Sequence, residues 1–202
     1  MQTIKKTVLA LSLSCIAAVC GAENFQQTLV FIRHAEKPAD GLGQITCQGL
    51  NRALALPQVL TSQYGKPDAI YAPDPAGKVN DHQQSYYYVR PLATIEPTAI
   101  RLGMPVNTPY GFLDINALES ELTQDAYKNS LVFVAWEHVK LEQVVKNIIA
   151  DQGGDASVVP HWKSSDFDSI YVIRISNNDG AKQVSFRQDQ QNLNNLSTNC
   201  PQ

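Results

Sequence analysis

The stretch "TLVFIRHAEKP", residues 28–38, joins a run of apolar residues directly to an arginine and a histidine. A short continuous apolar run predicts a strand that is buried on both faces of a sheet. This strand would end at Arg33 and His34. The two side chains are therefore either ordinary polar surface or functional groups that a rigid strand holds in place.

The stretch "SLVFVAWEH", residues 130–138, repeats this arrangement. Its apolar run predicts a second buried strand, and Glu137 and His138 follow the end of that strand directly. In open α/β sheets, ligands bind outside the carboxyl ends of the strands. If the two strands are neighbours, His34 and His138 face one crevice.

The remaining patterns alternate between helix and strand. Helices are expected over 46–65, with a kink or interruption at Pro57, and over 85–103, 115–129 and 137–153. Further strands are expected over 68–72 and 104–109, with a polar loop over 74–84. A hairpin is expected over 169–188 around "NNDG", followed by an irregular tail after Gln188. We therefore expect an α/β fold with three α/β/α layers, a mostly parallel central sheet and an antiparallel edge hairpin.

Residues 1–22 have the pattern of a secretory signal peptide. Lys5 and Lys6 precede an apolar segment, and small residues lead to an expected cleavage site after Ala22. A membrane anchor is the alternative, but the apolar segment is short for a membrane span. We expect an exported protein, in a bacterial periplasm if the source is bacterial, with one domain over 23–202 and no stable membrane insertion after cleavage.

The charge of the chain is mildly acidic. Without Lys5 and Lys6, the 16 basic residues fall to 14 against 19 acidic residues, so the formal net charge moves from -3 to -5. Such a balance argues against a nucleic-acid-binding role.

Two of the four cysteines, Cys47 and Cys200, lie outside the predicted signal peptide. In an oxidising compartment an even pair favours a disulfide over two unpaired thiols. A metal site is not expected, because no CxxC motif or histidine-rich cluster accompanies them.

A histidine at a strand end can act as a nucleophile toward phosphorus, because neutral imidazole is nucleophilic near neutral pH. Phosphoryl transfer then depends mainly on positioning and on stabilising the charge of the phosphoryl oxygens. Arginine suits this task, since its planar fork donates two parallel hydrogen bonds. Arg33 lies beside His34, and Arg90 lies in the expected helix after the second strand.

"RHAEKP", residues 33–38, resembles the signature of the histidine phosphatase superfamily, whose fold is phosphoglycerate-mutase-like. The family usually has glycine where this chain has Ala35. Further stretches resemble the family's later motifs in the same order: "ITCQGLNRA" (45–53), "IYAPDP" (70–75), "VRPLATIEPTA" (89–99) and "FVAWEH" (133–138).

The resemblance implies roles for individual residues. His34 would be the nucleophile that becomes phosphohistidine, and Arg33, Arg90 and His138 would complete the phosphate pocket. Glu36 and Lys37 would bind substrate or orient the site, or they simply pair with each other or cap the loop.

The acid that protonates the leaving group is less well defined by the resemblance. Asp114 lies about where one branch of the family carries its acid, so it is the first candidate. Glu137 and Asp81 are the alternatives.

The resemblance implies a phosphomonoester hydrolase of the histidine acid phosphatase type, which needs no cofactor and no metal. Its substrate would be a phosphorylated small molecule, or a phosphate group on a surface glycan or a protein. The alternative is a non-catalytic protein that binds phosphate or a phosphorylated ligand on the same fold.

Overall fold

The computed structural model describes residues 23–202, so the predicted signal peptide lies outside the described residues. The elements are β1 (Phe25–Arg33), α1 (Cys47–Tyr64), β2 (Ala69–Tyr71), β3 (Lys78–Asp81), β4 (Gln84–Tyr87), α2 (Arg90–Leu102), α3 (Ile115–Leu122), the 3-10 turn η1 (Asp125–Tyr127), β5 (Leu131–Trp136), α4 (His138–Asp151), the 3-10 turn η2 (Ala156–Val158), β6 (Ser169–Asn178) and β7 (Ala181–Gln190). None of the helices over residues 23–202 combines the length and the apolar composition that a membrane crossing requires.

The central sheet has five strands in the order β2-β5-β1-β6-β7. β2, β5 and β1 run parallel, whereas β6 pairs antiparallel with β1 and with β7. The prediction of an α/β fold with an antiparallel edge hairpin is therefore confirmed. The central sheet is mostly parallel but mixed: β6 is the one strand that runs in the opposite direction, and it pairs antiparallel with β1 and β7.

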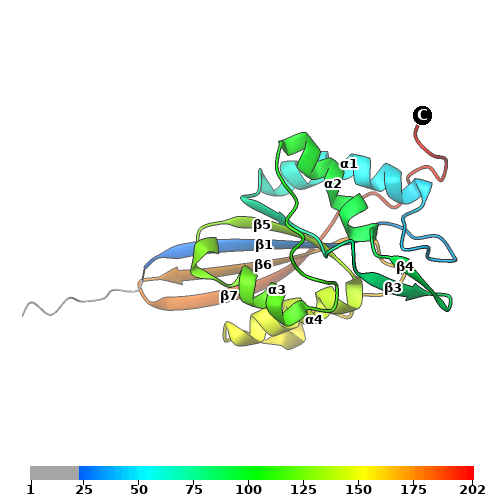
Figure 1. The fold of residues 1–202 in the computed structure, drawn as a ribbon. Helices are drawn as coiled ribbons and strands as arrows, with labels where there is room; N and C mark the ends of the chain where they lie inside the picture. Colours follow the sequence, from blue (N-terminus) through cyan, green and yellow to red (C-terminus); the bar gives the residue numbers. More distant parts are fainter. Residues whose placement is uncertain (1–22) are drawn as a thin grey trace, which may run out of the picture.

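The two faces of β1 pack against different helices. Leu29 and Phe31 belong to an apolar cluster that includes residues of α3 and α4. Val30 and Ile32 belong to a second cluster that includes residues of α1 and α2. Figure 1 shows α1 and α2 on one side of the sheet and α3 and α4 on the other. Because successive side chains of a strand point to opposite faces, the continuous apolar run of β1 serves both clusters.

The helix predicted from Thr46 is confirmed. The Thr46 hydroxyl accepts a hydrogen bond from the Gly49 amide at 3.0 Å, as an N-cap residue should. The expected interruption at Pro57 was wrong, since α1 runs through Pro57 as one element. Tertiary packing outweighs the local preference here, because Leu56, Pro57 and Leu60 are all buried in α1.

The region between β2 and α2 differs most from the prediction. Residues 74–84, expected as a loop, contain β3, and β3 pairs with β4 as a separate hairpin. The helix predicted from residue 85 begins only at Arg90, with Pro91 in its first turn. Proline is well tolerated there, because the first helical amides have no partner within the helix. The tyrosines that precede it suit a strand better than a helix.

The strand predicted over 104–109 was also wrong. This segment forms only one isolated bridge, between Asn107 and Tyr71. The hairpin predicted at "NNDG" is confirmed as β6 and β7, and its turn residues Asp179 and Gly180 both have positive φ.

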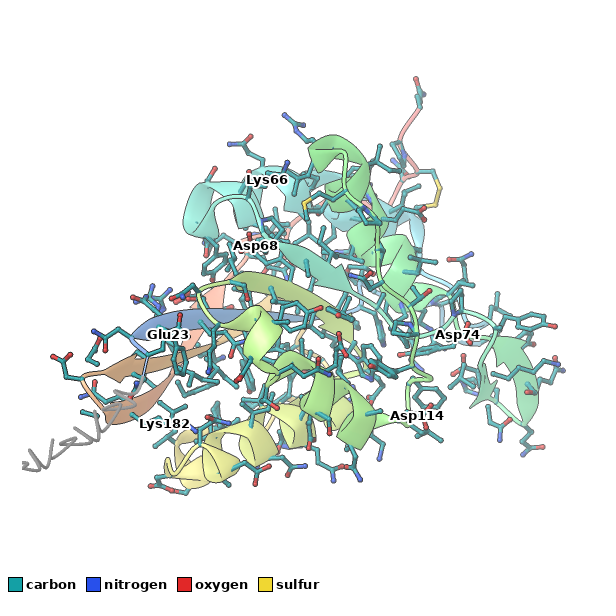
Figure 2. All side chains as sticks on the ribbon, turned by 60° about the vertical axis from the view of Figure 1, so that its left-hand side comes forward. Glu23, Lys66, Asp68, Asp74, Asp114 and Lys182 are labelled. Atoms are coloured by element: carbon teal, nitrogen blue, oxygen red, sulfur yellow. A yellow bond between two sulfur atoms is a disulfide. The ribbon has the colours of Figure 1, made fainter. Side chains whose placement is uncertain are left out.

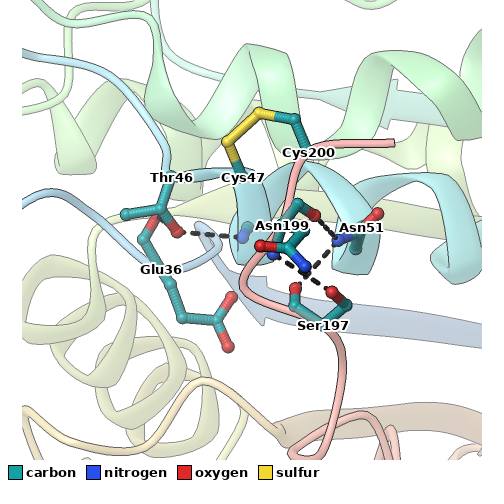
Figure 3. Close-up of a disulfide and its surroundings, with 8 residues drawn as sticks. Glu36, Thr46, Cys47, Asn51, Ser197, Asn199 and Cys200 are labelled. Atoms are coloured by element: carbon teal, nitrogen blue, oxygen red, sulfur yellow. Dashed lines mark hydrogen bonds between the residues drawn. A yellow bond between two sulfur atoms is a disulfide. The ribbon is translucent and has the colours of Figure 1, made fainter. Parts of the chain in front are cut away.

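A disulfide joins Cys47 to Cys200, so the predicted pairing is confirmed. It ties the C-terminal tail to the first residue of α1 (Figure 3). Beside it, the side-chain amide of Asn51 donates to the carbonyl oxygens of Ser197 and Asn199, each at 2.8 Å.

Replacing Cys47 and Cys200 together by serine should lower the free energy of unfolding by about 2–4 kcal/mol. The bond closes a long loop and so restricts the unfolded chain. Urea titration of the oxidised wild type and of the double variant measures the difference. A reductant should lower the stability of the wild type by a similar amount and leave the variant unchanged. Equal stability of the oxidised wild type and the variant would contradict the prediction.

Candidate active site

The two predicted strand ends lie side by side. β1 and β5 pair in register, with Arg33 opposite Trp136, and the His34 amide donates to the Trp136 carbonyl at 3.0 Å. Glu137 and His138 follow Trp136 directly. The expectation that the two strands are neighbours is therefore confirmed, and the residues after their carboxyl ends meet at one edge of the sheet.

His34 is almost fully buried, with 2% of its surface exposed. Its Nδ1 lies 2.7 Å from the Ala35 carbonyl oxygen. A carbonyl oxygen only accepts, so Nδ1 carries the proton and Nε2 keeps the free lone pair. Burial lowers the pKa of His34 to about 3; the hydrogen bond to Ala35 opposes this shift, and the charges of Arg33 and Arg90 add to it. The ring is therefore neutral at physiological pH.

The structure shows why alanine is tolerated at position 35, where the family signature has glycine. Its φ is not positive, so the backbone has no need of glycine. Its amide donates to the Thr94 hydroxyl of α2 at 2.9 Å. A Cβ on Gly49 would come within 2.7 Å of the Glu36 carbonyl oxygen and 3.2 Å of the Ala35 Cβ. The methyl group of Ala35 thus fits because Gly49 leaves space for it.

Arg33 is held by backbone and aromatic groups. Its Nη1 donates to the carbonyl oxygens of Ser164 and Asp166 at 2.7 and 2.9 Å, and its guanidinium carbon lies 3.9 Å from the centre of the Phe167 ring. Burial lowers the pKa of Arg33 to about 10, against the opposing charge of Glu137, so the group stays charged at neutral pH.

Arg90, the first residue of α2, is also buried and pairs with Asp81 from β3. Asp81 also accepts a hydrogen bond from the Gly43 amide at 3.1 Å, and Lys37 Nζ lies 3.8 Å from its other oxygen. Burial lowers the pKa of Arg90 to about 10, and Glu137 opposes this shift.

Some donors at this edge of the sheet have no partner within the described residues. The Nε atoms of Arg33 and Arg90 are both buried without one, and the same holds for the hydroxyl of Tyr88. The Tyr88 ring lies edge-on to the His34 ring, with centroids 6.2 Å apart. Unpaired buried donors are rare in proteins, and here two of them belong to positive charges.

His138 is the first residue of α4, and its Nδ1 lies 2.5 Å from Glu137 Oε1. Glu137 caps the helix, with its other oxygen accepting from the Lys140 amide at 2.9 Å. Burial favours the neutral acid, but the nearby His138 imidazole and the amides of Lys140 and Val139 outweigh it and lower the pKa of Glu137 to about 2. Glu137 is therefore a carboxylate that lies beside the His138 ring.

Glu36 and Lys37 have different charged partners in the structure. Glu36 forms an ion pair with Arg52 of α1, at 2.7 Å between Oε1 and Nη2, so its charge is already compensated. Lys37 is exposed; its partial desolvation and the charges of Arg90 and Arg33 lower its pKa. Of these two residues, only Lys37 is close enough to feel the charges of both Arg33 and Arg90.

Asp114 lies at the start of α3 and is exposed to solvent. Its Oδ2 accepts from the Gly111 amide at 3.0 Å. Phe112, in the same loop, packs on the Tyr88 ring at 4.9 Å between centroids, which brings this loop toward His34. Figure 2 shows Asp114 and Asp74 toward the end of the molecule that carries the β3–β4 hairpin, with Glu23 and Lys182 at the other end.

The sequence did not assign Tyr88, Phe167 or the carbonyl groups of Ser164 and Asp166 to this region. Tyr88 belongs to a run of three tyrosines at residues 86–88, which is a weak signal for a pocket rim, but nothing local distinguishes Phe167. Within the described residues, no group of three or more histidine, cysteine or acidic residues could hold a metal ion.

No protein-family model and no curated protein sequence matches the chain. Solved structures do match the chain. One is named "putative phosphohistidine phosphatase SixA" and comes from Nakamurella multipartitia; it is 14% identical, the match covers 83% of this chain and 97% of that chain, and the TM-score is 0.52. A weaker likeness, to a structure with the same name from Agrobacterium tumefaciens, has 13% identity, coverage of 73% and 90%, and a TM-score of 0.49.

At 14% identity the first likeness shows a shared fold. The likeness does not assign an activity to this chain, because one fold carries many functions.

The buried neutral His34 should make the stability of the protein depend on pH. Its folded pKa lies below that of an unfolded histidine, so the unfolded chain binds the extra proton as the pH falls below about 6.5. Between pH 6.5 and 4.5 the wild type should lose about 2 kcal/mol more than His34→Gln. Denaturant titration in phosphate-free buffer measures this difference.

His161→Gln is the matched control, because His161 is largely exposed. This variant should follow the pH dependence of the wild type. Parallel pH profiles for the wild type and His34→Gln would show that His34 does not titrate as described.

Proposed function

We propose that this protein is a phosphomonoester hydrolase that acts through a phosphohistidine on His34. The observation that carries the proposal is the pair of buried Nε donors on Arg33 and Arg90, at the edge of the sheet where His34 lies with a free Nε2. An anion with several acceptor oxygens suits these donors, and a phosphoryl group has that chemistry. Lys37 adds a further positive charge nearby.

The proposed reaction has two steps. In the first, Nε2 of His34 attacks phosphorus, an N–P bond forms, and the bond from phosphorus to the leaving oxygen breaks. In the second, water attacks the phosphohistidine, the N–P bond breaks, and inorganic phosphate leaves. Arg33, Arg90 and His138 would stabilise the negative charge on the phosphoryl oxygens.

We propose Asp114 as the acid that donates a proton to the leaving oxygen. Glu137, the first alternative, is a poor proton donor. The hydrogen bonds that Glu137 accepts keep it ionised, with a pKa of about 2. Asp81 is already engaged in an ion pair with Arg90. Asp114 pairs with no arginine, lysine or histidine among the described residues.

We further propose that the protein is exported and meets its substrate outside the cytoplasm. The Cys47–Cys200 disulfide and the signal-peptide pattern over 1–22 support this. Its substrate would be a phosphorylated small molecule or a phosphate group on a surface glycan or protein.

Hydrolysis of p-nitrophenyl phosphate tests the activity. The wild type should turn it over between pH 4 and 8, and His34→Ala should reduce the rate at least a thousandfold because the attacking nitrogen is gone. His161→Ala is the control and should keep the wild-type rate, since His161 is exposed and contacts Glu142. If the wild type binds phosphate without turnover, the protein is a phosphate-binding protein instead.

A comparison of leaving groups tests Asp114. Asp114→Asn should slow hydrolysis of an alkyl phosphate at least tenfold more than hydrolysis of p-nitrophenyl phosphate, because p-nitrophenolate leaves without a proton. Asp125→Asn is the control, since Asp125 is exposed and pairs with Lys128. Equal losses on both substrates would remove Asp114 from this role, and the same assay on Asp81→Asn and Glu137→Gln would then rank the alternatives.

A further inference from the structure

Arg52 of α1 is fully buried and bridges two carboxylates. Its Nε lies 3.1 Å from each carboxylate oxygen of Glu36, and its Nη2 donates to Oε1 at 2.7 Å. Its Nη1 donates to Asp168 Oδ1 at 3.1 Å. One planar cation thus joins two acidic residues from segments that are distant in the sequence.

Both carboxylates belong to segments that build the candidate active site. Glu36 follows His34 by two residues. Asp168 follows Phe167, whose ring lies under the Arg33 guanidinium, and its amide donates to Asp166 Oδ1 at 2.9 Å. The Asp166 carbonyl in turn accepts from Arg33. Arg52 therefore connects the loop after His34 with the loop that holds Arg33.

The C-terminal tail closes the outer side of this network. Gln191 Oε1 accepts from Arg52 Nη1 at 2.8 Å, and the amides of Asn192 and Leu193 donate to the Asp168 carboxylate at 3.0 and 2.7 Å. Further along, the tail is fixed to α1 by Asn51 and by the disulfide (Figure 3).

A buried ion network of this kind is poor evidence for stability, since apolar residues of similar volume often stabilise a core equally well. Its distinctive property is geometric, because a planar fork fixes the direction as well as the distance of each partner. Here the fixed partners are the loop that follows His34 and the loop whose carbonyl oxygens and Phe167 ring hold the Arg33 guanidinium. A small displacement of reacting groups can cost about a hundredfold in rate.

We propose that Arg52 is a positioning residue for phosphoryl transfer. It acts through Glu36 and Asp168, and it keeps the imidazole of His34 and the guanidinium of Arg33 in one fixed relation. This inference rests on the proposed function, but it also concerns the geometry of His34 before any substrate binds.

The test compares Arg52→Met, Arg52→Lys and Asp168→Asn in the full-length oxidised protein. For p-nitrophenyl phosphate, Arg52→Met should lower kcat at least tenfold and change KM much less, because the loss is in alignment. Arg52→Lys should recover part of kcat, since it restores the charge without the fork. Asp168→Asn keeps an acceptor for the tail amides, so its kcat should lie between that of the wild type and that of Arg52→Met. Arg174→Met, which removes an exposed arginine of β6, is the control and should match the wild type.

A second readout is independent of turnover. Long-range 1H–15N spectra of the four histidines report which ring nitrogen carries the proton. In the wild type, His34 should be protonated at Nδ1; in Arg52→Met, Arg52→Lys and Asp168→Asn its signals should shift or broaden as the bond to Ala35 loosens.

Unchanged kcat together with an unchanged His34 spectrum, in any of these variants that folds by circular dichroism, would overturn the inference. Absence of turnover in the wild type would instead count against the proposed function. In that case the His34 spectrum alone decides whether Arg52 positions the ring.

Discussion

The parallel pairing of β1 with β5 is the constraint on which the rest of the site depends. It aligns Arg33 with Trp136, so the residues that follow each strand emerge together at one edge of the sheet. The strands are held by apolar packing on both faces. The hydrogen bond from the His34 amide to the Trp136 carbonyl oxygen extends their pairing to the residue that follows β1. Groups more than one hundred residues apart in the sequence thereby share one rigid support.

The electrostatics of the site follow from burial. Arg33, His34 and Arg90 are all removed from water, which favours the neutral imidazole and lowers the pKa of each arginine without removing its charge at neutral pH. Glu137 and Asp81 supply the compensating negative charge. The arrangement keeps the His34 imidazole uncharged beside two cations, also below the pH at which a solvent-exposed histidine takes up a proton.

The accuracy of the sequence-based expectations varied with the range of the interactions involved. β1, β5, α1, α4 and the β6–β7 hairpin were predicted because their signals are local: apolar runs, the Thr46 cap and the "NNDG" turn. The β3–β4 hairpin was missed, and with it the contact between Asp81 and Arg90, because its strands are short and polar. The charge of Glu36 turned out to be compensated by Arg52, a partner sixteen residues away that no local pattern indicates.

By itself, the sequence determined the order of β1, α1, β5, α4 and the β6–β7 hairpin, and the buried character of the two central strands. It also determined the placement of Arg33, His34, Glu137 and His138 at strand ends and the availability of Cys47 and Cys200 for pairing. These follow from side-chain chemistry and periodicity along the chain. Only the tertiary structure decided that β6 runs antiparallel beside β1, that Ala35 fits against Gly49, and that Arg52 joins the His34 loop to the Arg33 loop and the tail. Such outcomes depend on which surfaces meet when the chain packs, and a linear pattern does not contain that information.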